Sequence, residues 1–145
     1  MISSICVAVL AGSVLEVLPT DRVTLTWRHS VEGTHWEEDY VATGDGLELV
    51  AARIEGTGAG MEPPASAIFI DGWWRYRPDL PALRRVELAN SEFVAGYSLC
   101  RVSDCRPLAS IVAQGTNAAL TTARCATSAA SFDNGGQFSG AGHDR

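Results

Sequence analysis

Ala67-Ile68-Phe69-Ile70-Asp71-Gly72-Trp73-Trp74-Arg75-Tyr76 is the segment that decides the fold class. Its Asp-Gly pair supplies the positive backbone φ angles that a two-residue hairpin turn requires. Such a turn pairs Phe69 with Trp74 and Ile70 with Trp73, so both faces of the hairpin carry large apolar side chains. The segment therefore predicts an antiparallel sheet that is either covered on both sides or exposes an aromatic patch.

Turn-forming residues recur along the rest of the chain, and short runs rich in Val, Ile, Thr, Trp and Tyr lie between them. The turn signals are Pro19-Thr20-Asp21, Glu32-Gly33, Gly44-Asp45-Gly46, Gly56 to Gly60, Pro63-Pro64, Asp71-Gly72, Pro78 to Pro81 and Asn90-Ser91. No long stretch keeps a helical period. This pattern predicts an all-β fold, an antiparallel β-sandwich or partly open barrel of about eight short strands.

The chain has 145 residues, which is enough for one domain with a real core. We expect a single all-β domain over residues 1–125. From residue 126 the composition shifts to Ala, Ser, Gly, Asn and Gln with little to bury, so residues 126–145 are predicted to form a disordered tail.

Charge excludes several classes of function. The net charge is −6 and all basic residues are arginine, so a Schiff-base lysine, a catalytic lysine base and a lysine-bearing phosphate loop are excluded. Arg84-Arg85 is the only arginine cluster, and nucleic-acid binding needs a larger basic surface. We expect no nucleic-acid partner.

Four cysteines are compatible with two disulfides and an oxidising compartment. Cys100 and Cys105 bracket four residues that read as a turn between two strands, which places their sulfurs opposite each other. Cys6 and Cys125 remain as partners if the chain termini pair. By loop-closure entropy the second link adds about 4 to 5 kcal/mol, and the first adds little.

Residues 5–18 are apolar but resemble neither a signal peptide nor a membrane span, because they lack a basic flank, contain Glu16 and are too short. We interpret them as one or two strands. The sequence therefore shows no clear export signal and predicts no membrane span.

The segment from Leu25 to Tyr40 concentrates the polar chemistry of the chain. If Val31 pairs with Trp36, one face carries Trp27 opposite Tyr40 and His29 opposite Glu38, while the other face carries Arg28 opposite Asp39 and Ser30 opposite Glu37. On the next hairpin, a two-residue turn at Asp45-Gly46 brings Arg53 to the face of Glu38, whereas a three-residue loop at Gly44 to Gly46 brings Ala52 there. The sequence leaves both open.

A histidine oriented by a carboxylate can act as a base or bind a substrate. The alternative for His29 and Glu38 is a structural pair in a partly buried sheet, which is the commoner fate. Ser30 points to the opposite face, so no Ser-His-acid triad forms, and no catalytic residue is assigned. His29, Glu32 and His35 have a metal-ligand spacing suited to a helix, but the segment reads as strand and turn, so we expect no metal.

Two further features are candidate binding elements. The loop Gly56 to Met61 could direct backbone N–H groups, including those near Gly58 and Gly60, at an anion; the alternative is a glycine corner where strands cross closely. Trp73 could stack on a ligand, although paired tryptophans more often lie in a core. The candidate ligand-binding residues are thus His29, Glu32, Glu38, Arg53, Gly58, Gly60 and Trp73.

Several motifs, in order, resemble the bacterial domain-of-unknown-function family DUF1850 over about residues 5–125. They are His29-Ser30-Val31-Glu32 with Trp36-Glu37-Glu38, Gly58-Ala59-Gly60-Met61-Glu62-Pro63-Pro64, Asp71-Gly72-Trp73-Trp74, Leu88-Ala89-Asn90-Ser91, and Cys100 to Cys105-Arg106-Pro107-Leu108. Genes of that family commonly neighbour tripartite ATP-independent periplasmic (TRAP) transporters whose solute receptor belongs to the TAXI class. Many members carry an N-terminal anchor or export signal, whereas this chain starts almost at its first predicted strand.

The resemblance implies a small accessory protein of a TRAP-TAXI uptake system, placed in the periplasm or otherwise outside the cytoplasm. Together with the lack of a nucleophile–base set and the polar site on a rigid sheet, it leads us to expect an accessory or ligand-binding module without enzymatic activity or cofactor. Its expected partners are the permease, the solute receptor or a small anion. Relatives often have other residue types at the positions of Gly33 and His35, which argues against a functional role for His35. The alternative is a small hydrolase-like or lyase-like enzyme that uses a His-Glu pair, and a third reading makes the motif a folding element only.

Overall fold

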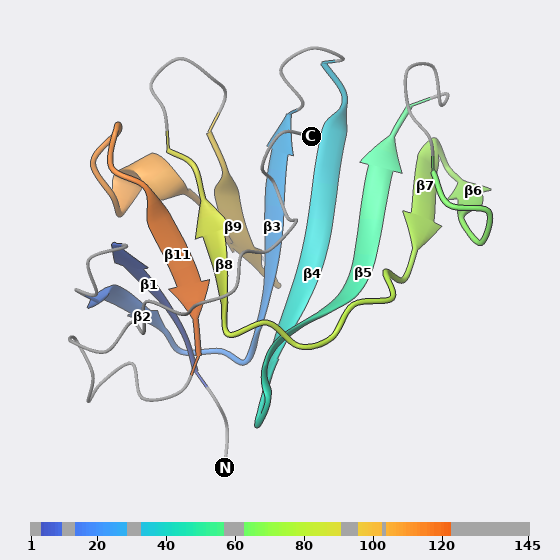
Figure 1. Cartoon of the computed structure of the whole chain (residues 1–145). Coiled ribbons are helices and arrows are strands. Elements are labelled where there is room, and N and C mark those ends of the chain that lie inside the picture. Colours follow the sequence, from blue (N-terminus) through green and yellow to red (C-terminus); the bar gives the residue numbers. More distant parts are fainter. Residues whose placement is uncertain are drawn as a thin grey trace.

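A computed structural model describes residues 4–9, 14–28, 33–56, 63–90, 96–102 and 104–122, which form two antiparallel sheets that face each other (Figure 1). The elements are β1 (Ile5–Val9), β2 (Val14–Leu18), β3 (Arg22–Arg28), β4 (His35–Thr43), β5 (Gly46–Glu55), β6 (Ile68–Ile70), β7 (Trp73–Tyr76), β8 (Arg85–Leu88), β9 (Ser98–Arg101), β10 (Asp104–Pro107), the 3-10 turn η1 (Leu108–Ser110) and β11 (Ala118–Thr121). These residues include no α-helix, and the sheets do not close into a barrel. The predicted all-β sandwich is confirmed.

The two sheets differ in size. The smaller has the order β2-β1-β11-β8, and the larger has the order β10-β9-β3-β4-β5-β7-β6. In Figure 1, β5, β7 and β6 lie at the right-hand end, on the side away from the four-stranded sheet. The described residues thus contain eleven strands rather than about eight, because several segments of three or four residues are too short to show alternation.

The core lies between the inner faces of the two sheets and follows the period of two that a half-buried strand requires. In β3, Val23, Leu25 and Trp27 are buried while the residues between them are partly exposed. The largest core side chains from the two sheets are Ile5, Val7, Leu18, Val86, Leu88 and Leu120 on one side and Val23, Leu25, Trp27, Tyr40, Leu47, Leu49 and Leu99 on the other.

Two local predictions are confirmed. Asp71 and Gly72 have φ angles of 53° and 87°, and the turn they form pairs Phe69 with Trp74 and Ile70 with Trp73. The segment predicted to form one or two strands contains two, β1 and β2. In addition, β1 pairs with β11, which meets the condition stated above for a Cys6–Cys125 link.

The predicted register of the β3–β4 hairpin is wrong. Trp27 lies opposite Trp36 rather than Tyr40, and Arg28 lies opposite His35 rather than Asp39. Both registers keep the same residues on the buried face, so burial alone could not distinguish them. The observed register stacks the rings of Trp27 and Trp36, whose centroids lie 6.0 Å apart.

A β-bulge separates the two halves of the β4–β5 pair. The turn consists of Gly44 and Asp45, because Thr43 pairs with Gly46, and the register shifts at Val50 so that Glu38 pairs with Ala52. Ala52 therefore takes the place beside Glu38, through a two-residue turn and a bulge rather than through either of the predicted turns. The bulge reverses the orientation of the rest of β5.

Other predictions concern residues outside the described ranges. Residues 123–145 are among them, so the domain end at residue 125 and the tail from 126 stay predictions.

Candidate functional site

Of the predicted binding residues, Glu38, Arg53 and Trp73 lie in described strands, and the structure does not bring them together. Glu38 lies on the inner face of β4, Arg53 on the outer face of β5, and Trp73 in β7 opposite Glu55. His29, Glu32, Gly58 and Gly60 lie outside the described residues. Their roles stay predictions.

Glu38 is a buried carboxyl group with an exposed fraction of 1%. The Tyr40 hydroxyl donates a hydrogen bond to its Oε1 atom at 2.9 Å. The prediction that Glu38 lies on the apolar side is confirmed, but its cross-strand neighbours are Leu25 and Ala52. The register that would place His29 opposite Glu38 is therefore wrong, while their side-chain contact is not tested because His29 lies outside the described residues.

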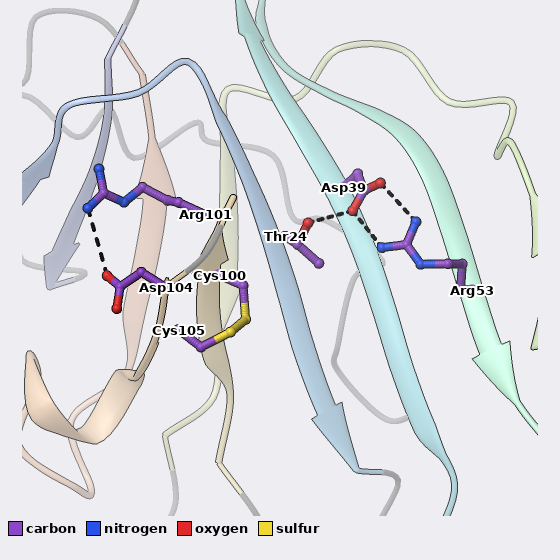
Figure 2. Close-up of a disulfide and its surroundings, with 7 residues drawn as sticks. All are labelled: Thr24, Asp39, Arg53, Cys100, Arg101, Asp104 and Cys105. Atoms are coloured by element: carbon purple, nitrogen blue, oxygen red, sulfur yellow. Dashed lines mark hydrogen bonds and ion pairs between the residues drawn. A yellow bond between two sulfur atoms is a disulfide. The ribbon is translucent and has the colours of Figure 1, made fainter.

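Arg53 belongs to a polar cluster on the outer face of the seven-stranded sheet, which we call the outer-face cluster: Thr24, Glu37, Asp39 and Arg53. The Arg53 guanidinium donates to both carboxylate oxygens of Asp39 at 2.8 and 2.9 Å, and its Nε atom donates to Glu37 Oε1 at 2.8 Å. The Thr24 hydroxyl donates to Asp39 Oδ1 at 2.7 Å (Figure 2). Three neighbouring strands are thus linked across one face.

The electrostatics of the outer-face cluster favour a permanent ion pair. Burial raises the pKa of the Asp39 carboxyl, but hydrogen bonds from Arg53 and Thr24 and the positive charges of Arg53 and Arg22 outweigh burial, so the pKa lies below its ordinary value. The hydrogen bond to Asp39 raises the pKa of the Arg53 guanidinium. Burial lowers it by less, so the pKa lies above its ordinary value. Neither group exchanges its proton near neutral pH, so the arrangement suits structural support better than acid-base chemistry.

A second group lies at the end of the same sheet, and we call it the sheet-end row: Arg28, His35, Glu55 and Trp73. His35 Nδ1 lies 3.1 Å from Glu55 Oε1, and Arg28 Nη2 lies 3.4 Å from both ring nitrogens of His35. Trp73 follows as the cross-strand neighbour of Glu55. A cation, an imidazole, a carboxylate and an indole therefore cross four adjacent strands in one line.

The sheet-end row contains a histidine–carboxylate pair, but it is formed by His35 and Glu55. Sequence reasoning missed it because the wrong register put Arg28 opposite Asp39 and because the family resemblance argued against His35. A signal was present in β5, where the buried positions change from Leu47 and Leu49 to Ala52 and Ile54. That change of phase indicates a bulge and turns Glu55 to the outer face.

The sheet-end row also lies where several connections of the chain meet. The β3–β4 connection leaves after Arg28, the β5–β6 connection leaves after Glu55, and the Gly56 amide donates to the Gly72 carbonyl at 3.0 Å. β4 begins at His35, so the β3–β4 connection also returns to the row.

The predicted Cys100–Cys105 disulfide is confirmed. The two residues pair across β9 and β10 with their Cα atoms 4.0 Å apart, and the ladder continues to Arg101 and Asp104, so the turn is shorter than the four residues expected. Cys100 is also the cross-strand neighbour of Thr24, which puts the disulfide beside the outer-face cluster (Figure 2).

Cys6 is buried in β1, opposite Thr121 of β11, and none of the described cysteines has a free thiol. Its predicted pairing with Cys125 stays a prediction, because Cys125 lies outside the described residues.

A small cavity of about 30 Å³ opens between the edge strands β2 and β10 and the neighbouring strand β9. Leu18, Leu99 and Ile111 line it together with Glu16, Arg101, Asp104 and Arg106, and the Arg106 guanidinium donates to the Glu16 carboxylate. Pockets that enclose small molecules have volumes of roughly 300 Å³ or more. This cavity is therefore too small to enclose one.

Within the described ranges, no three His, Cys, Asp or Glu side chains are grouped so as to hold a metal ion. The same part of the chain contains no helix that is long and apolar enough to cross a membrane.

Comparison with known proteins gives one family. No curated protein and no solved structure matches the chain. The family described as "Domain of unknown function (DUF1850)" matches residues 23–108, which is more than half of the chain and includes both the outer-face cluster and the sheet-end row. The chain therefore belongs to the DUF1850 family.

Proposed function

We propose that this protein is a small extracytoplasmic accessory module of a TRAP-TAXI solute uptake system, and that it acts by binding rather than by catalysis. The observation that carries the proposal is the sheet-end row. Arg28, His35, Glu55 and Trp73 offer charge, hydrogen-bonding capacity and an aromatic face on four strands of one sheet. Binding groups are positioned most accurately on such rigid elements.

Two features support binding over catalysis. The nearby outer-face cluster uses the charges of Arg53, Asp39 and Glu37 internally, so it supports the sheet and offers no free base. His35 and Glu55 are both partly exposed, which leaves them accessible to a partner.

The chemistry of the row favours an anionic group as ligand. Arg28 is a permanent cation, and the imidazole of His35 beside it can donate a hydrogen bond from a ring N–H. A carboxylate can then replace Glu55 as the partner of His35, while Trp73 supplies a surface for the apolar part of the ligand. Both a small organic anion and an acidic surface of the receptor or permease present such a group.

The Cys100–Cys105 disulfide supports an address outside the cytoplasm, because disulfides persist mainly in oxidising compartments. It lies on the same sheet as the sheet-end row, so the compartment that maintains the disulfide is also the one in which the row meets its partner.

Calorimetry of the purified protein against dicarboxylates and amino acids tests the ligand-binding form of the proposal. We expect saturable heat without turnover, and a loss of affinity of at least tenfold in the Arg28→Ala and His35→Ala variants, because a charged hydrogen-bonding partner contributes about 1.5 to 3 kcal/mol. Arg77→Ala is the matched control, since Arg77 is an exposed arginine whose salt bridge with Glu48 has an N–O distance of 3.5 Å.

The His35–Glu55 pair also keeps the rival enzyme hypothesis testable. Turnover that disappears in His35→Ala, with the fold retained, favours a hydrolase-like or lyase-like activity over the proposal. His29→Ala belongs in the same series, because His29 lies in the connection that leaves the row. A variant that unfolds, in a protein that binds no tested compound, favours a purely structural role.

A further inference from the structure

Within the part of the chain that the structure describes, the edge strand β6 lacks the features that usually keep sheet edges apart. Native edge strands are protected by charges, prolines, bulges or covering segments. Among the described strands, β10 has two charged residues and a proline, β8 has two charged residues, and β2 has an ion-paired glutamate and an irregular register with β1. In contrast, β6 consists of Ile68, Phe69 and Ile70, whose exposed fractions are 61%, 47% and 46%.

Among the described residues, the main chain of β6 presents one unpaired set of hydrogen-bonding groups at this edge. Ile70 and Trp73 flank a two-residue turn and therefore form a hydrogen-bonded pair, and in an antiparallel ladder the hydrogen-bonded pairs alternate with non-hydrogen-bonded ones. Phe69 is consequently in the non-bonded position relative to β7. Its N–H and C=O groups point outward from the sheet.

We propose that β6 pairs with β6 of a second copy of this chain, in an antiparallel arrangement around a two-fold axis at Phe69. The segment Ile-Phe-Ile reads the same in both directions, so this pairing places Phe69 opposite Phe69 and Ile68 opposite Ile70. The outward N–H and C=O of each Phe69 then satisfy those of the other. A closed two-fold contact requires a patch that is complementary to itself, and β6 has this property in both its main chain and its side chains.

The size of the patch sets the strength of the dimer. Three half-exposed large side chains offer on the order of 300 Å² per chain, whereas stable complexes bury roughly 1,200 to 2,000 Å² in total. The dimer is therefore weak and depends on protein concentration. Each chain also carries a net charge of −6, so the two copies repel each other and added salt strengthens the association. This inference is independent of the proposed function.

Sedimentation velocity over a range of protein concentrations, at low and moderate salt, tests the association. We expect a reversible monomer–dimer equilibrium that shifts toward dimer with salt. Ile68→Lys introduces a charge at each side of the pairing and weakens the dimer by roughly tenfold or more. Val17→Lys is the matched control, because Val17 lies on the edge strand β2 with an exposed fraction of 45% and leaves the equilibrium unchanged.

Oxidative cross-linking tests the register. Two residues that form a hydrogen-bonded pair have Cα atoms about 5.5 Å apart, which is within the range of a disulfide, so Phe69→Cys cross-links the two copies. Ile70→Cys does not cross-link the copies. In the proposed register the two Ile70 residues are offset by two positions, so their Cα atoms lie about 8 Å apart.

A protein that stays monomeric at every concentration overturns the proposal, as does a dimer that Ile68→Lys leaves intact. Cross-linking through Ile70→Cys but not through Phe69→Cys overturns the two-fold register. If Phe69→Cys fails to fold, the sedimentation of Ile68→Lys and Val17→Lys still decides whether β6 is the contact.

Discussion

Asp39 of β4 and Arg53 of β5 form a two-pronged ion pair on the outer face of the seven-stranded sheet, with N–O distances of 2.8 and 2.9 Å. The two residues are not directly opposite in the ladder, since Asp39 pairs with Ala51 and Arg53 pairs with Glu37. The guanidinium therefore reaches across two cross-strand positions and links β4 to β5 next to the bulge at Val50.

Asp39→Asn is expected to lower the free energy of unfolding by about 1 to 3 kcal/mol, because it removes one partner of a partly buried charged hydrogen-bond network. Chemical denaturation measures the change. Glu48→Gln is the control, since Glu48 meets Arg77 at an exposed salt bridge with an N–O distance of 3.5 Å, and such pairs contribute about 0 to 1 kcal/mol. Equal effects of the two substitutions contradict a stabilising role for the outer-face cluster.

Acid should weaken the fold partly through the same carboxyl group. The pKa of Asp39 is lower in the folded chain than in the unfolded chain, so its contribution to stability is present above the ordinary pKa of about 3.9. This contribution is lost as the pH falls through the lower, folded-state pKa. Stability measured from pH 6 down to about pH 2 should therefore fall less steeply in Asp39→Asn than in the wild type. Identical acid profiles contradict the lowered pKa.

Gly46 has a conformation and an environment that only glycine tolerates. Its φ angle is +128°, and a Cβ atom there would lie 2.4 Å from the Leu83 carbonyl oxygen, which accepts a hydrogen bond from the Leu47 amide. Gly46→Ala should cost at least about 2 kcal/mol of folding free energy. Gly44→Ala, two residues away, meets nothing within 4 Å and should change stability by less than about 1 kcal/mol. Thermal unfolding of the two variants in parallel checks the difference.

The Cys100–Cys105 disulfide closes a very short loop, so it should add only about 2 kcal/mol through loop-closure entropy. The double variant Cys100→Ala/Cys105→Ala is therefore expected to fold, with a moderately lower unfolding midpoint in denaturant. Peptide mapping of protein from the cell envelope under non-reducing conditions should recover the two cysteines as a linked pair. Free thiols at both positions would remove the main physical support for an extracytoplasmic address.

Local signals in the sequence predicted local structure well. The Asp71-Gly72 turn and its strand pairs follow from the φ angles that the two residues accept, and the Cys100–Cys105 link follows from two strands joined by a short turn. These features depend on residues that are close in sequence. The all-β class follows from turn density for the same reason.

The site depended on contacts between distant residues, and there the sequence was less informative. The β3–β4 register is set by the stacking of Trp27 on Trp36 and by the packing of Tyr97 against Trp27, with ring centroids 5.3 Å apart. The alternation of buried and exposed residues could not distinguish between registers that bury the same face. Together with the bulge at Val50, this kept the contacts of Arg53 with Asp39 and Glu37, and the His35–Glu55 pair, out of the predicted site.

We propose that this protein serves a TRAP-TAXI transporter by binding one of its components at the sheet-end row. The most direct test titrates the purified protein with the purified TAXI-type receptor and with the TRAP permease of the same organism, in the presence and absence of transported solute. We predict saturable binding to at least one component, weakened at least tenfold by the double variant Arg28→Ala/His35→Ala and unchanged by Arg77→Ala. Absence of binding to both components, or binding that the double variant leaves intact, contradicts the claim.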